Sequence, residues 1–167
     1  MSGHPSAEID DVVGRRFDLF GPSVEFLTSP YDSQKPFCVL RGIIPPGCGA
    51  ALHSHDDVED FYVVSGEVLV LRQGAHGYES IACKAGDYIR MPGGTAHGWH
   101  NVSSEPFVAL VITTPTLGKF FLEAGRPIEQ ASQPPISEDF VRFANVSVQY
   151  GYWNASPEEN AAVSIGP

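Results

Sequence analysis

The chain has 167 residues, a length at which one domain can bury a sizeable core. Hydrophobic residues make up 43% of it and charged residues 18%, a composition that excludes intrinsic disorder for most of the chain. Ten basic residues against twenty acidic ones give a formal net charge of −10. Charge of that sign repels phosphate backbones and anionic lipid, so it argues against nucleic acid and membrane surfaces as partners.

The cysteines and the apolar runs indicate the cellular compartment in which the protein is located. Cys38, Cys48 and Cys83 are odd in number and form no Cys-x-x-Cys pair, which argues against a disulfide framework and a thiolate zinc site. The first residues are polar and acidic rather than apolar, unlike a secretory signal. No apolar run approaches the roughly 20 residues that cross a bilayer. We therefore expect a soluble, cytoplasmic protein.

Glycine and proline punctuate short apolar segments along most of the chain, a rhythm typical of strands joined by turns. Turn signals recur about every 8–12 residues, which favours an all-β sandwich or barrel. The predicted strands are Phe17–Leu19, Val24–Leu27, Phe37–Ile44, Ala51–His55, Glu59–Ser65, Glu67–Arg72, Ser80–Cys83, Asp87–Met91, Ala96–Asn101 and Phe107–Thr113.

After Thr114 the pattern becomes helical. A short helix is predicted over Leu117–Ala124, and a second one over Phe140–Val148 after a Pro-, Gln- and Ser-rich loop. From Ser156 onward we expect a frayed end. The predicted organisation is an N-terminal arm of strands (1–34), a barrel core (35–115) and a helical C-terminal tail (116–167).

Histidines and one glutamate stand at regular positions within two glycine-bounded segments. The segments are Gly47-x5-His53-x-His55-x3-Glu59-x6-Gly66 and Gly86-x5-Pro92-x-Gly94-x2-His97-x3-Asn101. His53 and His55 are two residues apart, so an extended strand projects both imidazoles from one face. Glu59 has the same parity, and His97 follows a glycine-rich turn. Three imidazoles and a carboxylate suit a first-row transition metal, with further coordination positions left open.

Both segments match the two signature motifs of the cupin superfamily at every fixed position, and the chain resembles a single-domain cupin. The resemblance implies an all-β double-stranded β-helix, or jelly-roll barrel, with a metal in its mouth. It also implies that His53, His55, Glu59 and His97 are the metal ligands. The residues leave the metal open among iron, manganese, nickel, copper, cobalt and zinc.

A second resemblance concerns the C-terminal part. The run from Thr113 to Gly125, the proline-rich loop and a terminal helix ending near Tyr150 are similar to the tail of small quercetin 2,3-dioxygenase-like cupins. This resemblance implies a metal-dependent dioxygenase that acts on a small aromatic or enol-type substrate. Glu59 would then be a ligand and also the catalytic acceptor of the proton from the substrate hydroxyl.

Strand parity nominates residues for a substrate pocket. If Glu59 points inward, Phe61 and Val63 also point into the barrel, and Trp99 shares the parity of His97. Apolar and aromatic walls suit a small organic ligand, although the same side chains could simply fill the core.

Arg41 is a further candidate for the substrate pocket. Alternation along its strand places it on the same face as Val39 and Ile43. On an inner face it would bind a substrate carboxylate or phenolate, and on an outer face it would be solvated.

Other functions and partners remain open at this point. A non-catalytic small-molecule-binding or sensor cupin fits the same residues, and so does a cupin isomerase or decarboxylase, because a fold does not fix a function. Asp56 and Asp57 have the pattern of a solvated turn rather than of a catalytic carboxylate pair. Besides a small-molecule substrate, the expected partner is a second copy in a homodimer, to which Val12–Leu27 would contribute a strand.

Overall fold

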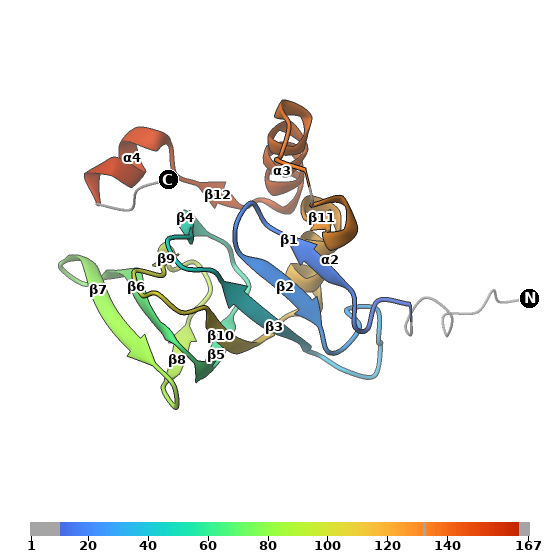
Figure 1. The fold of residues 1–167 in the computed structure, drawn as a ribbon, viewed down its shortest axis with the longest axis horizontal. Coiled ribbons are helices and arrows are strands. Elements are labelled where there is room, and N and C mark those ends of the chain that lie inside the picture. Colours follow the sequence, from blue (N-terminus) through green and yellow to red (C-terminus); the bar gives the residue numbers. More distant parts are fainter. Residues whose placement is uncertain (1–10, 132, 164–167) are drawn as a thin grey trace, which may run out of the picture.

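The short apolar runs of the chain form antiparallel strands in two sheets (Figure 1). The computed structural model of the protein describes residues 11–131 and 133–163, so the N-terminal residues considered as a signal lie outside the described part. The strands are β1 (Arg16–Asp18), β2 (Ser23–Phe26), β3 (Cys38–Ile44), β4 (Gly49–Ser54), β5 (Glu59–Ser65), β6 (Glu67–Gly74), β7 (Gly77–Lys84), β8 (Tyr88–Met91), β9 (His97–His100), β10 (Phe107–Thr113), β11 (Arg126–Pro127) and β12 (Trp153–Asn154).

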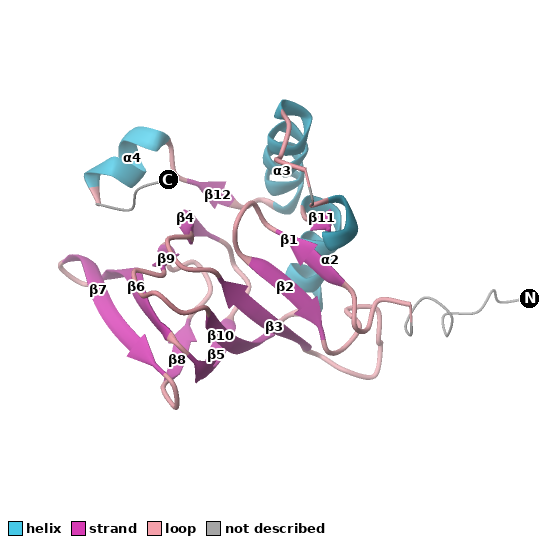
Figure 2. Ribbon diagram, viewed as in Figure 1, coloured by secondary structure: helices cyan, strands magenta, loops and turns pink. Residues whose placement is uncertain are grey.

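The order of the strands is that of a jelly roll. One sheet runs β11-β1-β2-β3-β10-β5-β8 and the other runs β12-β4-β9-β6-β7 (Figure 2). Consecutive strands along the chain alternate between the sheets at several points, for example from β3 to β4 and from β4 to β5. The prediction of an all-β double-stranded β-helix with a helical C-terminal tail is confirmed.

Alternation along the strands decides which side chains fill the space between the sheets. In β5, Phe61 and Val63 are buried whereas Tyr62 and Val64 are exposed. Val70, on β6 of the other sheet, is fully buried in the same cluster as Phe61 and Val63. Burial of this apolar face is the main stabilising term for the barrel.

Asn101 fastens the end of β9 to the neighbouring chain segments. Its side chain is fully buried, and its amide nitrogen donates to the carbonyl oxygens of Ile44 (2.9 Å) and Glu105 (2.8 Å). Its amide oxygen accepts from the backbone nitrogen of Ser103 at 2.9 Å. A buried polar group of this kind is tolerated only because its donors and acceptors are paired.

The C-terminal part adds helices at one end of the barrel. They are α2 (Pro115–Ala124), the short 3₁₀ helix η1 (Ile128–Gln130), α3 (Ser137–Tyr150) and α4 (Pro157–Ala162). Leu117 and Phe120 of α2 pack with Val146 of α3 in a second apolar cluster. In the described part of the chain, none of the helices has the length and apolar character needed to cross a membrane.

The expected fraying from Ser156 onward is wrong for residues 157–162. Ser156 and Glu159 form a reciprocal capping box, in which the Glu159 nitrogen donates to Ser156 Oγ (3.2 Å) and the Ser156 nitrogen donates to Glu159 Oε2 (2.7 Å). Asn160 Oδ1 also accepts from the backbone nitrogen of Leu52 at 2.9 Å, which ties α4 to β4. Local capping and one long-range hydrogen bond therefore order residues 157–162, although the composition of this segment alone does not predict order.

Two motif glycines provide a test of the turns. Both have left-handed backbones, with φ of +78° at Gly66 and +72° at Gly47. A Cβ at Gly66 would lie 2.4 Å from the carbonyl oxygen of Pro106, whereas one at Gly47 would meet no atom within 4 Å. Gly47→Ala should therefore cost only the conformational penalty of about 1–2 kcal/mol. Gly66→Ala should lower the free energy of unfolding by roughly 2 kcal/mol more, because backbone must move. Urea denaturation of both variants measures the difference, and equal losses would contradict this account.

Candidate metal centre

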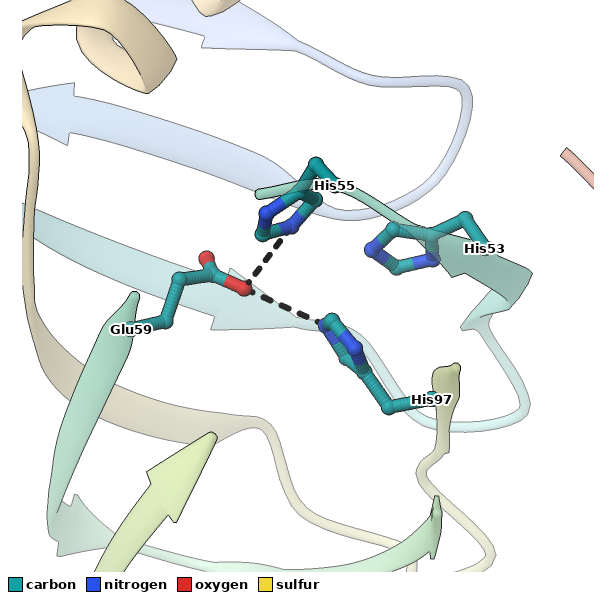
Figure 3. Close-up of side chains that lie close together, drawn as sticks. All are labelled: His53, His55, Glu59 and His97. Atoms are coloured by element: carbon teal, nitrogen blue, oxygen red, sulfur yellow. Dashed lines mark hydrogen bonds and ion pairs between the residues drawn. The ribbon is translucent and has the colours of Figure 1, made fainter. Parts of the chain in front are cut away.

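Four side chains converge at one end of the barrel (Figure 3). His53 lies on β4, His55 follows the end of that strand, Glu59 begins β5 and His97 begins β9. Because β4 pairs with β9, His53 is the cross-strand neighbour of His97. One ligand atom from each of the four residues lies within 4.8 Å of all the others. The structure thus brings together every residue of the predicted metal set.

Hydrogen bonds fix the tautomer of all three imidazoles. Each Nδ1 lies at a backbone carbonyl oxygen: His53 at Ala51 (2.7 Å), His55 at Asp57 (3.0 Å) and His97 at Thr95 (2.8 Å). A carbonyl oxygen can only accept, so each Nδ1 carries the hydrogen. In the neutral ring the lone pair is then on Nε2, which is the atom available to a metal.

Glu59 supplies the negative charge of the cluster. Its Oε2 lies 3.2 Å from Nε2 of His55 and 3.2 Å from Nε2 of His97 (Figure 3). Burial opposes ionisation of Glu59, but hydrogen bonds from the two imidazoles in their doubly protonated form outweigh it and hold the pKa of the carboxyl well below its usual range. The group is therefore a carboxylate at neutral pH.

The histidines respond to burial in different ways. Burial, followed by the nearby charge of His97, lowers the pKa of His53 to about 3, so this ring is neutral and free to bind at physiological pH. Burial also disfavours a charged His55, but the hydrogen bond and the charge of Glu59 outweigh it and raise the pKa of that ring.

The donor set fits a divalent transition metal. With hydrogens fixed on Nδ1, the neutral Nε2 atoms of His55 and His97 direct lone pairs at a carboxylate oxygen, and such an arrangement needs a proton or a cation between them. A divalent ion bound by three imidazole nitrogens and one carboxylate oxygen supplies that charge. His53 is half-buried while the other three residues are buried, so His53 marks the open side.

The aromatic residues predicted for the pocket lie in the packed core. Phe61, Val63 and Trp99 are all buried in one cluster. The ring centroids of Phe61 and Trp99 are 4.4 Å apart, and the Trp99 ring meets that of His97 edge-on at 6.4 Å. Trp99 therefore supports His97 from the core side of the cluster.

The inner-face placement of Arg41 is wrong. Arg41 is exposed on β3, and Nη1 of its guanidinium lies 2.8 Å from Oε2 of Glu25. The buried residues of β3 are Cys38, Leu40 and Ile44, so the alternation that places Leu40 inside turns Arg41 outward.

Two contacts near the site were not expected from the sequence. Asp57, interpreted as part of a solvated turn, accepts hydrogen bonds at its carboxylate from the hydroxyls of Thr114 and Tyr152. The Tyr152 ring also packs against that of His55, with centroids 5.2 Å apart. The available signal was Gly151, a left-handed helix end (φ +72°) that turns the chain after α3 back toward the barrel.

Removal of one imidazole tests the metal assignment. We expect His55→Ala to lower bound Co²⁺ or Mn²⁺ roughly tenfold or more, because the variant lacks a ligand nitrogen. The matched control is His100→Ala, since His100 is half-buried on β9 but does not belong to the cluster. Elemental analysis after dialysis against a fixed metal concentration gives the ratio. Full metal content in His55→Ala would refute the assignment.

The comparisons with known proteins agree with this geometry. Residues 40–113 match the cupin domain family. The structure is similar to oxalate decarboxylase from Bacillus subtilis (22% identity, TM-score 0.52), with 59% of this chain and 26% of that chain covered. It is also similar to Peruvianin-I, a cysteine peptidase from Thevetia peruviana latex (18% identity, TM-score 0.51), with 59% and 64% covered. This chain thus spans about a quarter of the decarboxylase.

An uncharacterised conserved protein with a double-stranded β-helix domain from Klebsiella pneumoniae is 24% identical, with a TM-score of 0.49 and with 64% of this chain and 85% of that chain covered. No curated protein matches the chain. The decarboxylase and Peruvianin-I structures, at these identities, support the fold alone. The family match covers the strands that carry the four candidate ligands. Residues 40–113 of the chain therefore form a cupin domain.

Proposed function

We propose that this protein is a metal-dependent dioxygenase, similar to the quercetinases, that acts on a small aromatic or enol-type substrate. The observation that carries the proposal is the convergence of three imidazoles and one buried carboxylate, with His53 on the more open side.

The proposed location is the cytoplasm. The three cysteines are free thiols, as expected in a reducing compartment: Cys38, Cys48 and Cys83.

In this proposal the protein residues hold and orient the reactants. His53, His55 and His97 present Nε2 atoms whose direction is set by their Nδ1 hydrogen bonds. A bound divalent metal would act as a Lewis acid for a deprotonated substrate oxygen and as a template for O₂. Glu59 is buried beside His55 and His97, and in this proposal it would accept the proton of the substrate hydroxyl while it remains in the ligand set.

The surroundings of the cluster suit a small apolar substrate. Trp99 would form the floor beneath His97, with Phe61 and Val63 behind it as rigid support. Packed aromatic walls keep water away from the core side of the cluster, which strengthens the electrostatic interactions within it. The substrate would therefore approach from the side of His53.

Oxygen consumption tests the reaction. The chain is stripped of metal, reloaded separately with Fe²⁺, Mn²⁺, Co²⁺, Ni²⁺, Cu²⁺ or Zn²⁺, and mixed with flavonols or enediols without added reductant. We expect O₂ uptake that depends on substrate, because a dioxygenase places both oxygen atoms in its product. Glu59→Gln should lower the turnover by roughly 10²-fold or more through loss of the proton acceptor.

Other outcomes would assign the site differently. Metal bound by the wild-type chain without O₂ uptake on any substrate would refute the dioxygenase. Release of CO₂ from a carboxylic acid substrate without net O₂ consumption would indicate a decarboxylase. Ligand binding without turnover would indicate a binding or sensor protein.

We further propose a homodimer that is formed through the outer face of the larger sheet. Tyr62, Val64, Tyr88 and Ile112, here called the sheet patch, are all exposed on β5, β8 and β10. Tyr62 is the cross-strand neighbour of Tyr88, so the apolar surface is continuous between β5 and β8. A two-fold axis lets one such patch cover its own copy. In the N-terminal segment expected to contribute a strand, β1 pairs with β2 and β2 with β3 of the same chain.

Charge placed on the sheet patch tests the dimer. Tyr62→Lys combined with Ile112→Lys should convert the protein from dimer to monomer, because like charges would face each other across the two-fold axis. Val148→Lys is the control, since Val148 is 78% exposed on α3, away from the patch. Sedimentation equilibrium measures the mass. A monomeric wild-type protein, or a dimer unaffected by both patch substitutions, would exclude this interface.

A further inference from the structure

The loop between His55 and Glu59 connects two of the candidate ligands, and its backbone carries the acceptor that orients one of them. The carbonyl oxygen of Asp57 accepts from Nδ1 of His55 at 3.0 Å. The next carbonyl, that of Val58, accepts from the hydroxyl of Thr113 at 2.7 Å. The position of this loop therefore decides where the Nε2 atom of His55 points.

Side chains from two distant segments hold the middle of the loop. The Thr114 hydroxyl donates to Oδ1 of Asp57, and the Tyr152 hydroxyl donates to Oδ2 of the same carboxylate. Thr114 is in addition the N-cap of α2, where its oxygen accepts from the backbone nitrogen of Leu117 at 3.1 Å. Asp57 is thus fixed by the start of α2 on one side and by the C-terminal segment on the other.

Tyr152 also touches the ligand itself. Its ring centroid lies 5.2 Å from that of His55 and 4.8 Å from that of Phe120 on α2. Tyr152 therefore contacts both the His55 ring and Asp57, the residue whose carbonyl oxygen orients that ring. Both contacts act on His55, which belongs to the cluster, rather than on a remote part of the barrel.

The position of Tyr152 is set by the strand that follows it. In β12, Trp153 pairs with Ser54 and Asn154 pairs with His53, so the C-terminal segment lies along β4 beside the cluster (Figure 1). The Ala155 nitrogen continues this pairing through a 2.9 Å bond to the carbonyl oxygen of Leu52. These residues lie beyond the matched cupin domain, which ends at residue 113.

We propose that Tyr152 is a positioning residue of the metal centre: it holds Asp57 and packs on His55, so that the C-terminal segment completes a site whose ligands all lie in the cupin domain. This inference rests on the proposed metal site. The competing explanation is that Tyr152 only anchors the tail to the barrel. In that case, removal of the Tyr152 hydroxyl would lower the stability of the fold but would not change the affinity for the metal.

Removal of a single hydroxyl separates the two explanations. Tyr152→Phe keeps the ring against His55 and Phe120 but releases the carboxylate of Asp57. Tyr150→Phe is the matched control, because the Tyr150 hydroxyl donates to Glu123 at 2.7 Å and its ring packs on Phe120 in the same aromatic cluster. Each full-length variant is titrated with Co²⁺ against a competing chelator, and the visible absorption bands of the bound ion are recorded.

The expected result is a loss of Co²⁺ affinity of about tenfold in Tyr152→Phe, together with shifted absorption bands. Tyr150→Phe should retain both wild-type values. Thermal unfolding without metal should show comparable losses of stability in the two variants. The inference is overturned if Tyr152→Phe keeps the wild-type affinity and bands. A wild-type chain that binds no Co²⁺ would instead remove the metal site itself and this inference with it.

A second variant tests the route through Asp57. If Tyr152 acts by holding this residue, Asp57→Ala should reproduce the loss of Co²⁺ affinity, and Asp57→Ala combined with Tyr152→Phe should lose little more than Asp57→Ala alone. Additive losses in the double variant would show that Tyr152 acts without Asp57, which contradicts the proposed route. If Asp57→Ala folds poorly, the comparison of Tyr152→Phe with Tyr150→Phe still tests the inference, because neither variant changes Asp57.

Discussion

A carboxylate that is 5% exposed at the end of an apolar barrel has to be compensated, and in this protein Glu59 is compensated by two imidazoles. Its Oε2 faces Nε2 of both His55 and His97, so separating these groups would leave a buried carboxylate uncompensated in a low-dielectric setting. Three of the surrounding strands position the groups of this contact. The β4–β9 pairing sets the distance between the histidines, and the start of β5 presents the carboxylate to them.

Protons and metal compete for the same role in the cluster. Without a metal, the raised pKa of His55 means that a proton on this ring balances the Glu59 charge, and that part of the stability is lost as pH rises through the raised value. The lowered pKa values of Glu59 and His53 act in the opposite direction, since acid protonates these groups more readily in the unfolded chain. A divalent ion satisfies the carboxylate without a proton on His55, so metal binding and the protonation of that ring exclude each other.

The sequence was informative wherever the determinant is local. The two-residue spacing of His53 and His55 predicts a common face, and for His53 and His97 the carbonyl that fixes the ring lies only two residues earlier in the chain. The strand limits Glu59–Ser65 and Phe107–Thr113 were predicted to the residue because apolar alternation and flanking turns define them. The inner-face prediction for Arg41 was wrong for a different reason. Parity groups a strand into two faces, but which face is buried depends on the opposite sheet.

The C-terminal segment marks where local information ends. Ninety-five residues separate Asp57 from Tyr152 along the chain, and no period or motif of one position predicts the other. Their contact exists because Gly151 ends α3 and turns the chain onto β4, whose free edge accepts β12. The four candidate ligands therefore lie within short motifs, whereas the contacts around His55 also involve Tyr152 in the C-terminal segment.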